Sequence, residues 1–142
     1  MLAERGHVQA ALFHLNRSID ESPNYAPSHE ELARILAATG QTDRALAQLE
    51  QAVALDPELL SAQNALVMGL LSSGRVDDAE ARLREILRRY PDSATAHNSL
   101  GIVLEHRGDA AGASAEYERA LKIDPDYAEA RQNLARLRRT HP

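Results

Sequence analysis

The 142-residue sequence contains no cysteine and no tryptophan, and aromatic residues make up only 4% of it. Without cysteine, the chain has neither disulfides nor thiolate metal ligands. No apolar run approaches the roughly 18 residues that a transmembrane helix needs. Residues 1–15 also lack the basic start and apolar block of a signal peptide. We therefore expect no membrane association and favour a cytoplasmic location.

The basic residues are almost all arginine, and they do not form the pattern of a nucleic-acid-binding surface. Lysine occurs once, at Lys122, and all other basic side chains apart from histidine are arginine, a bias typical of GC-rich bacterial genomes. The formal net charge is −5, and the arginines near the end of the chain have no aromatic residues between them. Binding of nucleic acid is therefore not expected.

The residues that are abundant repeat with a period of 34. Ala, Leu, Glu and Arg dominate, which favours helix. Three residue types keep the same interval: Gly6, Gly40, Gly74 and Gly108; Ala11, Ala45, Ala79 and Ala113; and Pro23, Pro57, Pro91 and Pro125. An internal repeat of this length indicates an array of small structural units stacked on one another.

Each unit is predicted to be two helices, with glycine at the turn between them and proline after the second. Glycine reaches the left-handed conformation that ends many helices, and proline cannot continue a helix. We expect Thr42 or Asp43 to cap one second helix. The predicted helices are His7–Glu21, Ala26–Thr39, a helix that follows the cap at Thr42 or Asp43 and stops near Asp56-Pro57, Leu60–Ser73, Val76–Arg89, Ala94–Arg107, Ala110–Ile123 and Ala128 to about Arg139.

The period divides the chain, predicted to be one domain over residues 1–142. Residues 26–59, 60–93 and 94–127 are complete repeats, and residues 128–142 form a polar capping helix. Residues 1–25 form a partial repeat, in which Met1–Arg5 matches only the tail of a first helix that ends at Gly6. The simplest explanation is that the chain was cut from a longer protein or that an upstream region was lost.

The residues shared by the units resemble the tetratricopeptide repeat (TPR) family. The family's pattern of small, large and turn residues is matched in the third complete unit by Ala96, Leu100, Gly101, Gly108, Ala113, Tyr117, Ala120 and Pro125, and comparably in the other two. The resemblance implies an all-α fold, a right-handed superhelical α-solenoid of antiparallel helix pairs with the first helices lining the concave side. His29, Gln63 and His97 stand where the family often has Trp.

The same resemblance implies a groove along the first helices that binds a protein or an extended peptide. Asparagine offers both a donor and an acceptor to a peptide backbone, and methionine and aliphatic side chains add apolar contact. The expected peptide-binding residues are Arg34, Asn64, Met68, Leu71, Asn98, Ile102, Asn133 and Arg136. The family's clamp for the carboxylates of heat-shock chaperones maps to Glu30, Arg34, Ala65, Thr95 and Ser99, of which only Arg34 could serve.

No residue pattern predicts catalysis, a metal or a cofactor. His29 and His97 lie at equivalent positions two units apart, so they cannot share a tetrahedral metal site. The neighbouring acids Glu30-Glu31 and Asp77-Asp78 point to different sides of a helix. The glycines punctuate the repeat and do not form a phosphate-binding loop.

The sequence thus predicts a non-catalytic scaffold that binds a protein or peptide. The alternative is an accessory or assembly region of a larger enzyme, such as a transferase, hydrolase or sulfatase. We also expect weak homodimer formation through the first helix, where Leu12, Leu15 and Ile19 form an apolar stripe that lacks most of its partner helix.

Overall fold

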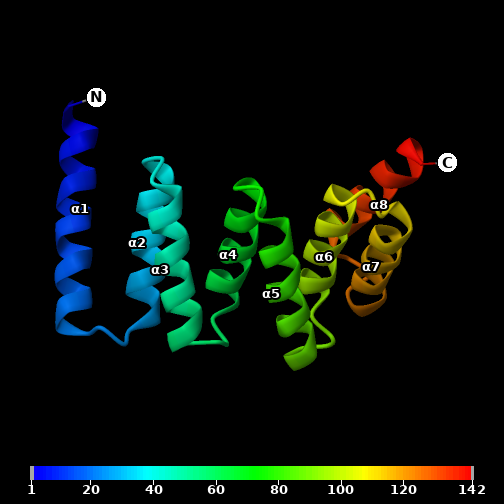
Figure 1. Ribbon diagram of the computed structural model, residues 1–142, viewed down its shortest axis with the longest axis horizontal. Helices are drawn as coiled ribbons and strands as arrows, with labels where there is room; N and C mark the ends of the chain where they lie inside the picture. Colours follow the sequence, from blue (N-terminus) through cyan, green and yellow to red (C-terminus); the bar gives the residue numbers. More distant parts are fainter. Residues whose placement is uncertain (1, 142) are drawn as a thin grey trace. The chain divides into compact units, whose positions relative to one another are not determined.

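The computed structural model describes residues 2–141, with side chains from residue 6, and these residues form helices joined by short turns (Figure 1). The helices are α1 (Leu2–Glu21), α2 (Ala26–Ala38), α3 (Thr42–Leu55), α4 (Leu60–Ser72), α5 (Val76–Arg89), α6 (Ala94–His106), α7 (Ala110–Ile123) and α8 (Ala128–Thr140). Residues 2–141 contain no strand. The all-α fold is therefore confirmed, and from α2 onward the helix ends agree with the sequence to within about one residue, the usual uncertainty of helix ends.

The first helix differs from the prediction, because α1 runs through Gly6 without a turn. The φ angle of Gly6 is not positive, and a Cβ atom at this position would meet nothing within 4 Å. Glycine lowers helix stability by about 1 kcal/mol but does not by itself break a helix. A turn forms where a second helix packs back on the first, and residues 2–5 are too few to supply that packing. The predicted break at Gly6 is wrong.

The other three period glycines do make the predicted turns. Gly40, Gly74 and Gly108 have φ angles of +78°, +73° and +79°. At the first of these turns the amide of Gly40 donates to the carbonyl of Ala37, and the amide of Gln41 donates to that of Leu36, the pair of bonds found in a Schellman motif. A side chain other than glycine would be strained in this conformation.

The cap expected for α3 does not form, and a side-chain cap that was not predicted forms at α7. Gln41 is the N-cap of α3 and makes no side-chain cap, so the prediction that Thr42 or Asp43 caps this helix is wrong. Thr42 already lies inside the helix, where its hydroxyl no longer faces the free amides. In α7 the capping position holds Asp109, whose carboxylate accepts from the amide of Gly112 at 2.9 Å.

The residues group into two compact units, one up to Gly69 and the other from Leu70, with the boundary inside α4. In the first unit α2 packs against α1 and α3, and Leu32, Leu36, Ala45 and Leu49 are buried. In the second unit α5, α6, α7 and α8 pack in succession. Its core includes a cluster of Ala113, Tyr117, Leu134 and Leu137.

A close contact between α6 and α7 shapes the core of the second unit. The Tyr117 ring is fully buried and lies against Gly101. A Cβ atom on Gly101 would be only 2.5 Å from Tyr117 Cε1, well inside contact distance. Glycine at position 101 therefore makes room for the Tyr117 ring. Two periods earlier, in the first unit, the equivalent pair is Ala33 and Leu49.

Candidate functional site

The polar residues at the position where the family often has tryptophan all bond to a proline carbonyl. His29 Nε2 donates to the carbonyl oxygen of Pro23 at 3.0 Å, and His97 Nε2 donates to that of Pro91 at 2.9 Å. Gln63 and Arg131 make the equivalent bonds to Pro57 and Pro125. In each case the donor lies six residues after the proline, so the side chain fastens the turn to the helix that follows it.

The second ring nitrogen of each histidine is also occupied. His29 Nδ1 lies 2.8 Å from Gln48 Oε1, and His97 Nδ1 lies 2.6 Å from Glu116 Oε2. Both neighbours of the His97 ring are oxygen atoms that accept hydrogen bonds, so neither ring nitrogen is free to bind another group. Among the side chains that the structure describes, those of residues 6–141, no group of three His, Cys, Asp or Glu is placed to hold a metal ion. These histidines are structural.

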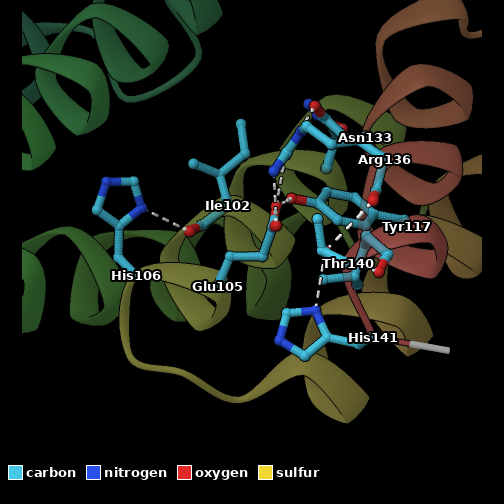
Figure 2. Close-up of polar contacts among 10 residues, drawn as sticks. Ile102, Glu105, His106, Tyr117, Asn133, Arg136, Thr140 and His141 are labelled. Atoms are coloured by element: carbon cyan, nitrogen blue, oxygen red, sulfur yellow. Dashed lines mark hydrogen bonds and ion pairs between the residues drawn. The ribbon is translucent and has the colours of Figure 1, made fainter.

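Three of the residues expected to bind peptide, Asn98, Asn133 and Arg136, are joined by hydrogen bonds on α6 and α8, and Figure 2 shows Asn133 and Arg136. Asn133 Nδ2 donates to Asn98 Oδ1 at 3.0 Å. Arg136 makes two bonds to the Glu105 carboxylate, at 2.9 and 2.8 Å, and a longer one of 3.4 Å to Asn133 Oδ1. We call Asn98, Asn133, Arg136 and Glu105 the polar row, which fixes the geometry of one surface of the second unit.

The polar row is anchored in the core by Tyr117, whose hydroxyl donates to Glu105 (Figure 2). Burial alone would raise the pKa of the Glu105 carboxyl, but the bonds from Arg136 and Tyr117 outweigh it, and this pKa lies below its usual range. Burial, followed by the bond to Glu105, raises the pKa of Tyr117 well above its usual value. Glu105 is therefore ionised and Tyr117 neutral at physiological pH.

The predicted peptide-binding residues include Arg136 but not Glu105, and the repeat pattern gives Tyr117 no polar partner. The signal in the sequence is the hydroxyl of Tyr117, at a position where the two preceding repeats have Leu49 and Leu83. A buried tyrosine hydroxyl usually finds a partner. That expectation points toward a nearby acceptor but does not identify Glu105.

The remaining predicted binding residues have different surroundings. Arg34 is exposed and pairs with Glu31 on its own helix, at 2.9 Å between Nε and Oε2. Met68 is 51% exposed, and Asn64 is half-buried with no hydrogen bond from its side chain to the described residues. Leu71 is buried and offers little surface. Ile102 is half-buried and packs against the core cluster that contains Tyr117.

The first helix presents one partly covered apolar side. Leu12, Leu15 and Ile19 are half-buried, whereas Phe13 is 65% exposed. The helix is tied to α2 by a bond of 3.0 Å between the hydroxyls of Ser18 and Ser28. Among residues 2–141, every helix is too short or too polar to span a lipid bilayer.

Solved structures with the same fold include repeat proteins from several sources. A structure titled "MamA 41-end from Desulfovibrio magneticus RS-1" is 20% identical with a TM-score of 0.77, over 97% of this chain and 78% of that one. A thermophilic TPR protein in Thermus thermophilus is 26% identical with a TM-score of 0.74, over 98% and 77%. The first TPR of Spaghetti (RPAP3), bound to the HSP90 peptide SRMEEVD, is 17% identical with a TM-score of 0.71, over 82% and 92%.

Family comparison agrees with the fold. A comparison with curated proteins returned no match. Two family profiles described as tetratricopeptide repeat match residues 2–67 and residues 64–128, which together span most of the sequence. Repeats of this kind are interaction scaffolds with protein or peptide partners. From its repeats and its fold, the chain belongs to the tetratricopeptide repeat family.

Proposed function

We propose that the chain is a non-catalytic scaffold that holds an extended peptide against the first helices of its repeats, with the polar row of α6 and α8 as the principal contact. Two contacts carry the proposal. Asn98 and Asn133 share a hydrogen bond, and Arg136 makes two hydrogen bonds to the Glu105 carboxylate. These bonds orient side chains from helices more than 30 residues apart before any ligand arrives. Preorganised groups lose little entropy on binding, which favours affinity.

The exposure of each residue assigns its part in binding. Asn98 is only 3% exposed, so it positions Asn133 and contributes little direct contact. Asn133 is half-buried and Arg136 is exposed, so both can reach a ligand. An Asn amide bonds equally well to the N–H and the C=O of a peptide, whatever the peptide's side chains. In the first unit, Arg34, Asn64 and Met68 are proposed as further contacts.

The proposal is tested by selecting short random peptides on the wild-type protein and measuring their affinity by calorimetry. We expect micromolar binding, about −8 kcal/mol. Replacing Asn133 with Ala removes up to two bonds to the peptide backbone and should weaken binding about five- to tenfold. Asn16→Ala, an exposed asparagine on α1, is the matched control and should leave affinity unchanged.

A second pair of variants tests the contribution of Arg136 to peptide binding. Arg136→Gln should weaken binding, whereas Arg139→Gln, at an exposed arginine on the same helix, should not. Equal affinity of the selected peptides for wild type, Asn133→Ala and Arg136→Gln would contradict the proposal. So would a selection in which no peptide is enriched.

A further inference from the structure

A second candidate site lies on a different side of α6 from the polar row, where residues of α5, α6 and α7 line a pocket. A pocket of about 830 Å³ opens there, with Leu87, Leu100 and Ile123 among its apolar lining. Its volume falls in the range of sites that bind small molecules or short peptide segments. On α6, His97 and Leu100 line the pocket, while Asn98, Ile102 and Glu105 share a different face at spacings of four and three residues. The pocket is thus separate from the polar row.

Cations surround this pocket although the whole chain is acidic. Arg84, Arg88, Arg119 and Lys122 all line it, in a protein with a formal net charge of −5. Only Arg84 is strongly engaged, with both of its bonds to Glu80. The side chains of Arg88 and Lys122 make no ion pair or hydrogen bond within the described part of the chain. Arg119 lies a distant 3.8 Å from Glu116.

The acids of the pocket do not neutralise these cations. Glu116 is already bonded to His97 at 2.6 Å, and Asp92 is an exposed loop residue with no ion pair in residues 2–141. The lining therefore carries more positive than negative charge, with Arg84, Arg88, Arg119 and Lys122 against Asp92 and Glu116. A pocket of one charge sign with low-dielectric walls attracts ligands of the opposite charge.

The repeat itself does not require the cations. Two periods earlier, the positions equivalent to Arg84, Arg88, Arg119 and Lys122 hold Asn16, Asp20, Gln51 and Ala54. The apolar positions behave differently, since Leu87, Leu100 and Ile123 correspond to Ile19, Leu32 and Leu55. The apolar lining is thus part of the helix-pair framework, while the charge is particular to this pocket.

We propose that this pocket binds an acidic segment of a partner protein, whose carboxylates pair with Arg88, Arg119 and Lys122 while an apolar side chain packs on Leu87 and Ile123. The inference goes beyond the proposed function, because it assigns a second surface and a different ligand chemistry. Spaced single carboxylates fit better than one phosphate, since the three cations sit on two helices.

The test uses a blocked, fluorescein-labelled peptide Glu-Leu-Glu-Glu-Leu-Glu and its counterpart with Gln in place of every Glu. Fluorescence anisotropy should show at least about tenfold tighter binding of the Glu peptide at low salt, weakening as the salt concentration rises to about 300 mM. The methyl resonances of Ile123 should shift as the Glu peptide is added.

Charge-matched variants identify the site. The triple variant Arg88→Gln, Arg119→Gln and Lys122→Gln should lose about tenfold or more in affinity for the Glu peptide. The control triple, Arg17→Gln, Arg44→Gln and Arg139→Gln, changes the net charge equally at exposed sites outside the pocket and should bind like wild type. All five of the arginines and the lysine are exposed, so both triples should keep the wild-type thermal midpoint.

Several outcomes would overturn the assignment. Equal loss of affinity in both triples would show that binding follows net charge and not this pocket. Displacement of the peptide by inorganic phosphate at about its cellular millimolar level would favour a phosphate ligand. Self-association of the wild type that the pocket triple abolishes would make a second copy the occupant. Asn133→Ala should leave this binding unchanged, so that failure here and failure of the polar row are distinguishable.

Discussion

Replacing Gly101 with Ala is expected to destabilise the protein, although Ala is the better helix former. The new Cβ atom would lie 2.5, 2.7 and 2.9 Å from three atoms of the Tyr117 ring. Because this ring is fully buried, it cannot move aside into solvent. Overpacking of this kind costs about 1–3 kcal/mol. The gain in helix propensity offsets about 1 kcal/mol. The net loss in the free energy of unfolding should therefore be about 0–2 kcal/mol.

Gly6→Ala is the matched control, because it brings the same gain in helix propensity without the steric clash. Gly6 also lies inside a helix, but nothing is within 4 Å of where its Cβ would be. Gly6→Ala should stabilise the protein by up to about 1 kcal/mol, so the two substitutions should differ by about 1–3 kcal/mol. Urea unfolding monitored by circular dichroism measures both, and a difference of 1 kcal/mol corresponds to roughly 2–4 °C in thermal midpoint for a chain of this size.

The first unit supplies the expected rescue. Its equivalent pair is Ala33 and Leu49, so Ala should be tolerated at position 101 once Tyr117 is replaced by Leu. In a double-mutant cycle, only the gain in helix propensity remains in the Tyr117→Leu background, so Gly101→Ala should stabilise that variant by about 1 kcal/mol. The coupling energy should then be about 1–3 kcal/mol. The steric account would be refuted by additive effects, or by a Gly101→Ala protein as stabilised as Gly6→Ala.

The remaining predictions concern other contacts. Because the pKa of Glu105 is lowered in the folded state, its ionised form stabilises that state above its unfolded pKa of about 4.3, and the contribution disappears as the pH falls through the folded pKa. Glu105→Gln should thus cost about 1–2 kcal/mol at pH 7 in urea unfolding, and the gap from wild type should narrow below about pH 4; a gap independent of pH would contradict this. His97→Gln should cost less than about 1 kcal/mol, because Gln63 fills the same role, whereas His97→Ala should cost about 1–3 kcal/mol in thermal unfolding; equal costs would argue against the proline carbonyl bond. Gly108→Ala should cost about 1–2 kcal/mol, since Ala is strained at a φ of +79°; a neutral effect would be inconsistent with that strain. Weak self-association through α1 should be visible by sedimentation velocity and should decrease in Phe13→Ser, a residue 65% exposed; a monomer at high concentration would exclude it.

The helices could be predicted from the sequence because their signals are local and repeated. Gly40 and Pro57 act through their own backbone dihedral angles, and each signal recurs with every period. Gly6 shows the limit of that reasoning. The same residue at the same place in the period stays helical when no second helix packs across the turn, since packing and not glycine supplies the energy.

The polar row was harder to predict, because its members are joined by contacts across helices. A period of 34 relates Ile102 to Arg136 in sequence, yet the bond that forms runs from Arg136 to Glu105, one turn further along α6. Periodicity gives equivalent positions but not the diagonal along which long side chains meet. Burial is likewise invisible in the sequence: Asn64 and Asn98 occupy equivalent positions one period apart, but Asn98 is only 3% exposed whereas Asn64 is half-buried.

The bond to the proline carbonyl has a consequence for how this repeat can vary. Histidine, glutamine and arginine differ in size and charge, but at His29, Gln63, His97 and Arg131 each brings an N–H group to the equivalent proline carbonyl. The position therefore tolerates any side chain that is long enough and can donate, and excludes acceptors such as Glu, whose carboxylate would face a carbonyl oxygen. Repeats exchanged between such arrays should keep their turns if this one donor is retained, whatever residue supplies it.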